Sequence, residues 1–314
     1  MDPVVVEVAD RVWCCEQPDG PRRIRQVVVA GTERALVVDT GLPESPGAGL
    51  LDLLDELALP PTVLLTHPDA DHVGGTGAIL ARHPGAPVLA GTDDRALVGD
   101  PERAIRERYD AFAADGVPFD AADAARARSR FGPAFGPVRG VGDRDVVDLG
   151  GRTVELVATP GHSPGHTAAW VADAGVLVAA DAAMGEAITD LAGARFIPPM
   201  YAPPAAYRAT LDRLCALPIA ILLTGHEPVL EGRDATVFLA ASGAACDRLQ
   251  RLVAAALDDE PATLPTLCDR VHAAYGGLPD GSQAALAMTV DGHLAELADV
   301  EVDAGPPRTF RRPS

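Results

Sequence analysis

The stretch Thr66-His67-Pro68-Asp69-Ala70-Asp71-His72-Val73-Gly74-Gly75 decides the fold of this chain. An apolar run, Val63-Leu64-Leu65, precedes it and predicts a buried strand. A second apolar run begins at Ala78, after the glycine pair, and predicts a helix. Two histidines and two aspartates therefore lie on a turn between a strand and a helix. Imidazole and carboxylate groups are ligands of first-row divalent metals, so this turn predicts a metal site.

Three later strand patterns each end in another residue of a metal-binding type. These residues are His162 after 153–158, Asp181 after 175–180 and His226 after 219–223. A single histidine at a strand end is more often structural than functional. The repetition at four strand ends favours one shared site, because a loop that leaves a rigid strand can direct several side chains to one point.

In this order along the chain, Asp39, the 67–72 cluster, His162 in Thr-Pro-Gly-His, Asp181 and His226 in Thr-Gly-His resemble the metallo-β-lactamase fold superfamily. The resemblance covers about residues 1–230. It implies an α/β fold: an αβ/βα four-layer sandwich, with the metals at one edge of two mixed sheets. It also implies a domain over 1–232 and a small helical, winged-helix-like extension over 233–314, similar to that of thioesterase-like branches of the superfamily.

The resemblance further implies a site for two divalent metal ions, with zinc foremost and manganese or iron as alternatives. The first ion would be held by His67, Asp69 and His162, and the second by Asp71, His72 and His226, with Asp181 bridging the two. Asp71 would also orient or accept a proton during catalysis. Asp39 would support the ligand loop by hydrogen bonds, and His166 would brace its own loop.

Asp69 departs from the common pattern of the superfamily, which has a histidine at this position. In one interpretation Asp69 binds metal, and three carboxylates then face two divalent cations. The bound water would become a weaker acid, and harder ions such as Mn²⁺ or Fe²⁺ would be favoured beside Zn²⁺. In the other interpretation Asp69 points away and one metal binds. We favour ligation.

Residues of about 100–140 form an insert that holds five of the thirteen aromatic residues of the chain. This density predicts a lid or pocket wall, and a helical hairpin packed on the body by its rings is an equal alternative. We expect a substrate pocket lined by Tyr109, Phe112, Phe131, Phe135 and Met184. Quorum-lactonase relatives place a tyrosine where Met184 stands, so a lactonase of that type would lack its proton donor here.

The net charge of −19 predicts a surface that repels polyanions, so we expect a small-molecule substrate and no nucleic acid as partner. The segment from Arg233 onward holds twelve acidic and seven basic residues, which argues against a DNA-binding wing. For this segment we expect a role in packing, in homodimer formation or in closing the pocket. Five scattered cysteines and the lack of a signal or membrane segment predict a cytoplasmic protein with free thiols.

These features favour a metallo-hydrolase that uses a metal-bound hydroxide on a small ester, thioester or lactone with an apolar acyl part. A metal-dependent phosphodiesterase or nuclease is one alternative, suggested by the Asp69 variant and the C-terminal extension. A mononuclear-iron dioxygenase of the same superfamily is a second alternative. A regulatory module that only binds its ligand is a third.

Overall fold

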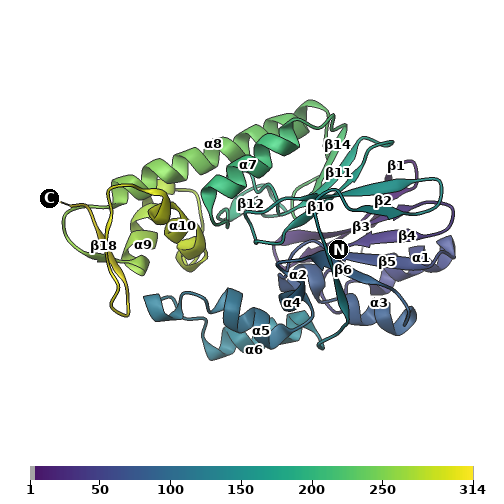
Figure 1. The fold of residues 1–314 in the computed structure, drawn as a ribbon, viewed down its shortest axis with the longest axis horizontal. Helices are drawn as coiled ribbons and strands as arrows, with labels where there is room; N and C mark the ends of the chain where they lie inside the picture. The colour runs from purple at the N-terminus through teal and green to yellow at the C-terminus, as the bar shows by residue number, and fades with distance from the viewer. Residues whose placement is uncertain (1–3, 314) are drawn as a thin grey trace.

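Two mixed sheets pack face to face, and helices cover the outer face of each, as the ribbon in Figure 1 shows. The structure is a computed structural model and describes residues 4–313. This arrangement confirms the four-layer αβ/βα sandwich that the sequence predicted.

The first sheet has seven strands in chain order, antiparallel from β1 to β4 and parallel from β4 to β7. Its strands are β1 (Val4–Ala9), β2 (Val12–Asp19), β3 (Arg22–Ala30), β4 (Ala35–Val38), β5 (Pro61–Leu65), β6 (Val88–Gly91) and β7 (Val138–Val141).

The second sheet has six strands in the order β15-β14-β11-β10-β9-β8, and only β11 and β14 run parallel. Its strands are β8 (Val146–Asp148), β9 (Thr153–Ala158), β10 (Thr167–Val171), β11 (Val176–Ala180), β14 (Ile221–Thr224) and β15 (Leu230–Glu231). A separate hairpin joins β12 (Ile188–Thr189) to β13 (Arg195–Ile197).

Alternation along β3 shows how the layers form. Val27 and Val29 point into the core between the sheets, whereas Val28 and Ala30 point to the core under the helices of the first sheet. Successive strand residues face opposite sides of a sheet, so a strand buried on both faces is a continuous apolar run. The second sheet divides its residues in the same way between the central core and the core under α7 and α8.

The helices of the first sheet connect its parallel strands. They are α1 (Asp52–Leu57), α2 (Ala70–Val73), α3 (Thr76–Arg82) and α4 (Arg95–Val98). A π-helical turn, Gly47–Leu51, leads into α1, and Ala58 ends the helix in the left-handed region with φ of 52°. The long helices α7 (Pro204–Cys215) and α8 (Arg233–Ala256) cover the second sheet.

The insert, defined here as residues 101–131, lies between β6 and β7 and projects beside the C-terminal helices (Figure 1). It consists of α5 (Pro101–Ala104), the π-helical turn η2 (Ile105–Tyr109), the 3-10 turn η3 (Ala113–Asp115) and α6 (Ala121–Phe131). Asp100 and Asp120 begin the two α-helices, because each carboxylate accepts a hydrogen bond from the backbone N–H three residues on.

The C-terminal part begins with α8 at Arg233 and adds three smaller helical elements and a small sheet. These are α9 (Leu264–Tyr275), η4 (Gln283–Leu286), α10 (Ala287–Glu296) and the antiparallel strands β16 (Ala262–Thr263), β18 (Thr309–Arg311) and β17 (Glu301–Asp303). Its apolar side chains join those of β10, β11 and α7 in one continuous core. The winged-helix resemblance and the domain boundary at 232/233 stay predictions. Among residues 4–313, we find no helix with both the length and the apolar character needed to cross a bilayer.

Candidate metal centre

The predicted ligands converge at one edge of the sandwich, where strands from both sheets end. The 67–72 turn follows β5, His162 lies on the loop from β9 to β10, Asp181 follows β11 and His226 lies just beyond β14. Within the described part of the chain, three overlapping groups are close enough to hold a metal ion. The groups are His67 with His72 and Asp181, His67 with Asp69 and His162, and Asp71 with His72 and His226.

Asp39 fixes the start of the ligand turn. Its Oδ1 accepts a hydrogen bond from the backbone N–H of Thr66 at 2.8 Å, and its Oδ2 accepts from the Thr66 hydroxyl at 2.8 Å and from His72 Nδ1 at 2.7 Å. The Thr40 hydroxyl donates to the carbonyl oxygen of His72 at 3.0 Å. The end of β4 thus holds the turn after β5 at both of its ends.

The four histidines of the ligand set all use Nδ1 for a structural hydrogen bond. Nδ1 of His162 donates to the Met200 carbonyl oxygen at 2.7 Å, and Nδ1 of His226 donates to that of Arg23 at 2.9 Å. His67 uses the Thr66 hydroxyl at 2.9 Å, and His72 uses Asp39. Because a partner at Nδ1 fixes the tautomer, Nε2 of each ring in its neutral form carries a lone pair directed toward the site.

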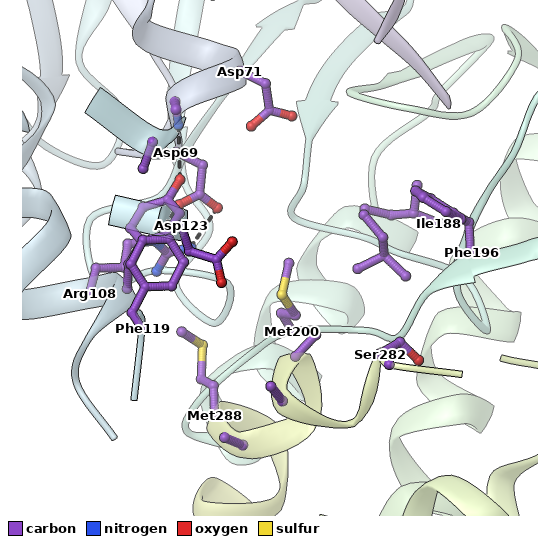
Figure 2. Close-up of a pocket in the computed structure, with 18 of the residues that line it drawn as sticks. Asp69, Asp71, Arg108, Phe119, Asp123, Ile188, Phe196, Met200, Ser282 and Met288 are labelled. Atoms are coloured by element: carbon purple, nitrogen blue, oxygen red, sulfur yellow. Dashed lines mark hydrogen bonds and ion pairs between the residues drawn. The ribbon is translucent and has the colours of Figure 1, made fainter. Parts of the chain in front are cut away.

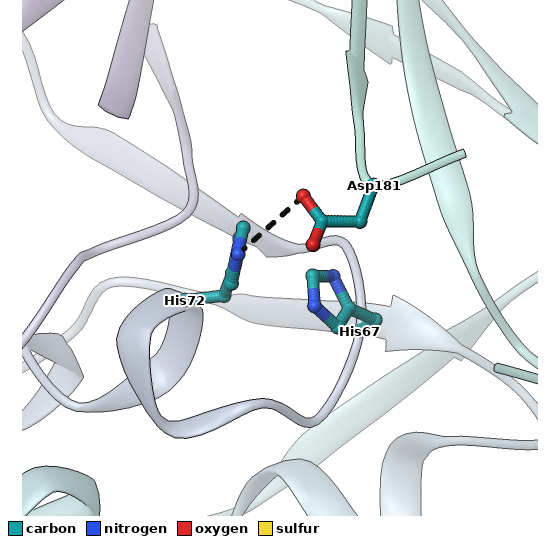
Figure 3. Close-up of side chains that lie close together, drawn as sticks. All are labelled: His67, His72 and Asp181. Carbon is teal, nitrogen blue, oxygen red and sulfur yellow. Dashed lines mark ion pairs between the residues drawn. The ribbon is translucent and has the colours of Figure 1, made fainter. Parts of the chain in front are cut away.

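The surroundings of two of these Nε2 atoms show whether a metal ion fits the site. Nε2 of His67 and of His72 is buried and has no hydrogen-bond partner among the residues that the structure describes. A buried polar atom without a partner is costly, so such atoms call for an explanation. Figure 3 shows both rings and the Asp181 carboxylate directed at a common point. A divalent cation there would satisfy all three groups.

The separations between ligand atoms also fit a metal. Ligands about 2.1 Å from a tetrahedral ion lie about 3.4 Å from one another. Asp181 Oδ2 lies 3.3 Å from His226 Nε2, and Asp181 Oδ1 lies 3.7 Å from His72 Nε2. Asp69 Oδ2 lies 3.5 Å from His67 Nε2, whereas its 2.9 Å distance from His162 Nε2 is that of a hydrogen bond. The two carboxylate oxygens of Asp181 thus face two histidines of the second group, and Asp181 also lies within reach of His67 of the first group.

The electrostatics of the site favour a bound cation. Burial alone lowers the pKa of His72, but the carboxylates of Asp39, Asp181 and Asp71 outweigh it and raise this pKa to about 10. Burial likewise raises the pKa of Asp71, whereas Arg22 and the neighbouring histidines lower it to about 2. The carboxylates are therefore anionic at neutral pH, and their field attracts positive charge.

Two arginines that the sequence did not reveal touch the ligand set. Arg108 of η2 donates to both carboxylate oxygens of Asp69, with Nη2 2.8 Å from Oδ2, and its Nη2 lies 2.9 Å from His162 Nε2. Arg22 of β3 places Nη2 2.7 Å from Asp71 Oδ2 and 2.8 Å from Asp19 Oδ2. An isolated arginine in a strand or a charged helical segment carries no signal of such a contact.

The loop that carries His162 has its own supports. The Ser163 hydroxyl donates to the buried carboxylate of Asp94, and burial raises the pKa of Asp94. Nδ1 of His166 bonds to the Thr159 hydroxyl at 2.7 Å, and the His166 ring stacks on His67 with centroids 5.2 Å apart. His166 therefore lies beside the ligands and braces its loop. Asp94 was missed, because nothing in the sequence links it to 159–166.

A cavity of about 690 Å³ opens onto the ligands, and Figure 2 shows Asp69 and Asp71 at its inner end. Tyr109 and Phe112 line it, as do Phe119, Phe196 and Met288, which we did not predict.

Three predicted pocket residues lie elsewhere. Phe131 is 1% exposed in the core beneath the insert, and Phe135 packs on that core beside a separate shallow depression. Met184 is buried, and its sulfur accepts a hydrogen bond from the Met200 N–H at 3.3 Å. None of the three is among the residues that line the cavity described here. Their prediction as pocket residues needs correction.

Comparison with known proteins agrees with this geometry. The family model described as the metallo-beta-lactamase superfamily matches residues 19–226. A hydroxyacylglutathione hydrolase of Acidiphilium cryptum (strain JF-5) is 31% identical over 169 residues, which cover 54% of this chain and 51% of that protein. A hydroxyacylglutathione hydrolase of Rhodobacter capsulatus is 30% identical over 207 residues, 65% of this chain and 63% of that protein. The chain thus spans between about half and somewhat under two thirds of the length of these two curated relatives.

Solved structures share the fold over nearly the whole chain. A metallo-beta-lactamase family protein of Thermus thermophilus superposes with a TM-score of 0.74, at 23% identity, covering 98% of this chain and all of that one. A beta-lactamase domain protein of Burkholderia ambifaria gives 0.72 at 20% identity, covering 98% of this chain and 95% of that one. With the family model over residues 19–226 and the predicted ligand residues gathered at one sheet edge, this chain belongs to the metallo-beta-lactamase superfamily.

Proposed function

We propose that the chain hydrolyses a small thioester or ester whose acyl part is apolar. The observation that carries this proposal is the cavity of about 690 Å³ in front of the ligands, a volume typical of small-molecule sites. Aliphatic and aromatic side chains form much of its wall. They include Phe112, Val117, Phe119, Ile188, Phe196, Ile197, Met200 and Met288.

Three separate parts of the chain build this wall. The insert supplies Phe112 and Phe119, and the β12–β13 hairpin supplies Ile188 and Phe196. The turn η4 and the start of α10 supply Ala284, Ala285, Ala287 and Met288. Figure 2 shows Phe119, Ile188, Phe196, Met200 and Met288 around the space that leads to the carboxylates. An acyl chain in this space would bring its carbonyl carbon to the ligand edge. The C-terminal part therefore has a role in closing the pocket, in this proposal.

We further propose that the ligand set holds two divalent ions, zinc foremost, with His67, Asp69 and His162 on one and Asp71, His72 and His226 on the other. When bound, such ions supply Lewis acidity and lower the pKa of a water molecule that attacks the acyl carbon. The chain itself orients the ligands through the Nδ1 hydrogen bonds, and Asp181 lies within reach of His67 of the first group and of His72 and His226 of the second. Asp71, whose carboxylate lies among the ligand residues, would orient the attacking water and accept its proton.

The curated relatives support the thioester class. Both are named hydroxyacylglutathione hydrolases, and a hydroxyacylglutathione is a thioester. The wall of the present cavity is largely apolar around its charged inner end, so we propose an apolar acyl group for this chain.

A substrate panel tests the proposal. Purified protein loaded with Zn²⁺ or Mn²⁺ is assayed on acyl thioesters, aryl esters, lactones and bis(p-nitrophenyl) phosphate, with Asp181→Ala as the inactive control. We expect the highest kcat/KM on thioesters or esters, rising as the acyl chain grows from two carbons toward the length of the cavity. Turnover of the phosphodiester alone would replace this proposal with a phosphodiesterase. Oxygen consumption with a persulfide by an iron-loaded protein would replace it with a dioxygenase.

A further inference from the structure

Arg108 makes an unusual set of contacts with residues of the first metal group. Its guanidinium donates to both oxygens of Asp69, lies 2.9 Å from His162 Nε2 and donates from Nη1 to the carbonyl oxygen of His162 at 3.1 Å. Its side chain is 9% exposed. A planar guanidinium with two parallel donors matches a carboxylate, and such charge-assisted pairs are strong.

The contact with His162 competes directly with a metal ion. Nδ1 of His162 donates its proton to the Met200 carbonyl oxygen, so Nε2 carries a single lone pair. In the neutral ring this lone pair accepts the hydrogen bond from Arg108, because the Asp69 carboxylate, also 2.9 Å away, can only accept. It cannot accept this bond and coordinate a cation at the same time. Nη2 of Arg108 must therefore leave His162 before an ion binds there.

The contact between Arg108 and Asp69 also opposes binding of the first metal ion. Coordination by Asp69 would set the positive guanidinium close to a divalent cation in a site of low dielectric, where like charges repel strongly. The pair also neutralises the carboxylate on which the first ion depends. Two of the three ligand residues in this group are thus already held by Arg108, while His67 Nε2 has no hydrogen-bond partner within residues 4–313.

The second metal group is less obstructed. Arg22 pairs with Asp71, but its Nη1 lies 3.5 Å from His226 Nε2, at the outer limit of a hydrogen bond. Nε2 of His72 has no hydrogen-bond partner in the described part of the chain, and Asp181 faces both histidines. The two groups therefore differ in how many arginine contacts must break before a metal ion binds.

Arg108 also connects the ligand turn to the insert. The next residue, Tyr109, accepts a hydrogen bond from the Ala70 N–H at 3.1 Å, and Ile105, one turn earlier, is buried in the core of the first sheet. Two adjacent residues of η2 thus contact residues 69 and 70. Loss of the Arg108 contacts would remove the stronger part of this connection.

We propose that Arg108 competes with the first metal ion for Asp69 and His162, so that the first site is the weaker of the two and its loading frees the insert from the ligand turn. This role of Arg108 goes beyond the proposed hydrolysis and does not depend on the identity of the acyl substrate. Arg108 acts through Asp69 and His162 and is in this sense a positioning residue.

A metal titration tests the competition. Chelator-stripped wild type, Arg108→Met and Arg106→Met are titrated with Zn²⁺ against a chromophoric chelator. Arg106 lies in the same turn, but its side chain is 65% exposed and pairs with Glu107, so it is the matched control. We expect Arg108→Met to tighten the weaker zinc constant by about tenfold, the loss of one charge-assisted interaction. Arg106→Met should leave both constants within about twofold, which is inside the usual range of surface substitutions.

If the weaker zinc constant were unchanged in Arg108→Met, Arg108 would not compete with the ion, and the proposal would be overturned. A weakened constant would also overturn it, because Arg108 would then orient Asp69 for the metal. A second measurement needs no variant. Hydrogen exchange of wild-type residues 105–119 is compared in chelator and in saturating Zn²⁺. We expect faster exchange with zinc bound, and equal or slower exchange would overturn the proposed release of the insert. Both readouts are independent of turnover.

Discussion

Asp39 Oδ2 lies 2.7 Å from His72 Nδ1, although the two residues follow different strands, β4 and β5. The carboxylate accepts the Nδ1 proton and so directs the Nε2 lone pair of His72 into the metal centre. The same carboxylate holds the Thr66 backbone and hydroxyl. One buried side chain thus fixes both the path of the ligand turn and the tautomer of a ligand.

Replacing this carboxylate should weaken the second metal site. In Asp39→Asn the amide NH₂ must face one of three donors, so either a Thr66 contact or the His72 contact is lost. We expect zinc affinity at the second site to fall about 10- to 100-fold, as for other partners of metal ligands. Zinc titration of the apoprotein measures this, with exposed Asp55→Asn as control. An affinity equal to that of the wild type would show that Asp39 has no part in orienting His72.

Gly225 is needed because the ligands leave no room for a side chain. A Cβ at this position would lie 2.4 Å from Asp181 Oδ1 and 2.9 Å from His72 Cε1. Gly225→Ala should therefore displace the carboxylate of Asp181, which bridges the two ions in our proposal, and lower the zinc content at saturation to about one ion per chain or fewer.

The matched control for this glycine is Gly243→Ala in α8, where a Cβ meets only Leu211 Cδ1 at 4.0 Å. This substitution should keep the metal and stabilise the fold by about 0.5–1 kcal/mol, since alanine favours a helix interior. Metal analysis and thermal unfolding separate the two variants. Full zinc content in Gly225→Ala would contradict the bridging role of Asp181.

A charged side chain in the cavity should lower kcat/KM specifically for apolar substrates. Met288 lines the cavity, whereas Leu191, at the tip of the β12–β13 hairpin, is 42% exposed and is not among the lining residues described. We expect Met288→Lys to lower kcat/KM on the longest apolar thioester by at least about tenfold, because a buried ammonium group is costly to desolvate. Metal content should stay that of the wild type. An equal loss in Leu191→Lys would point to a general effect of charge.

His293 should make stability sensitive to acid. It is fully buried, with Nδ1 2.7 Å from Gln250 Oε1 and Nε2 3.1 Å from the Tyr201 hydroxyl. Burial, with a further contribution from Arg208, lowers its pKa from 6.5 to about 4. The unfolded chain therefore binds more protons between these two values, so stability is full above about pH 6.5 and falls as the pH drops toward 4.

Urea denaturation at pH 7 and pH 5 measures this contribution. The wild type should lose about 2 kcal/mol more than His293→Gln over this interval, on the basis of about 1.36 kcal/mol per pKa unit. Both proteins are measured with the same metal loading, so that titration in the metal centre cancels. Identical losses in the two proteins would show that His293 does not carry the effect.

Much of this structure was predictable because the strands of a two-sided sheet are apolar runs that end in polar residues. Val63-Leu64-Leu65 followed by the ligand turn is the clearest case, and the same pattern places Asp181 after β11. The motifs at the ends of these runs, in their order along the chain, carry the resemblance that implied the fold. Their convergence on one edge follows from the fold.

The partners of the ligands could not be predicted in the same way. Asp69 and Arg108 are 39 residues apart, and their contact depends on how η2 packs beside the ligand turn. Aromatic density in the insert indicated a packed wall but could not separate Phe119, which lines the cavity, from Phe131, which is in the core. Which side of a helix faces a cavity is decided by tertiary packing.

The central claim is that His67, Asp69, Asp71, His72, His162, Asp181 and His226 form one metal centre. Anomalous diffraction at the zinc edge from crystals of the zinc-loaded protein tests it most directly. The account predicts two peaks about 3.5–4 Å apart, with the carboxylate of Asp181 between them. No anomalous peak within coordination distance of His72 and Asp181 would contradict it.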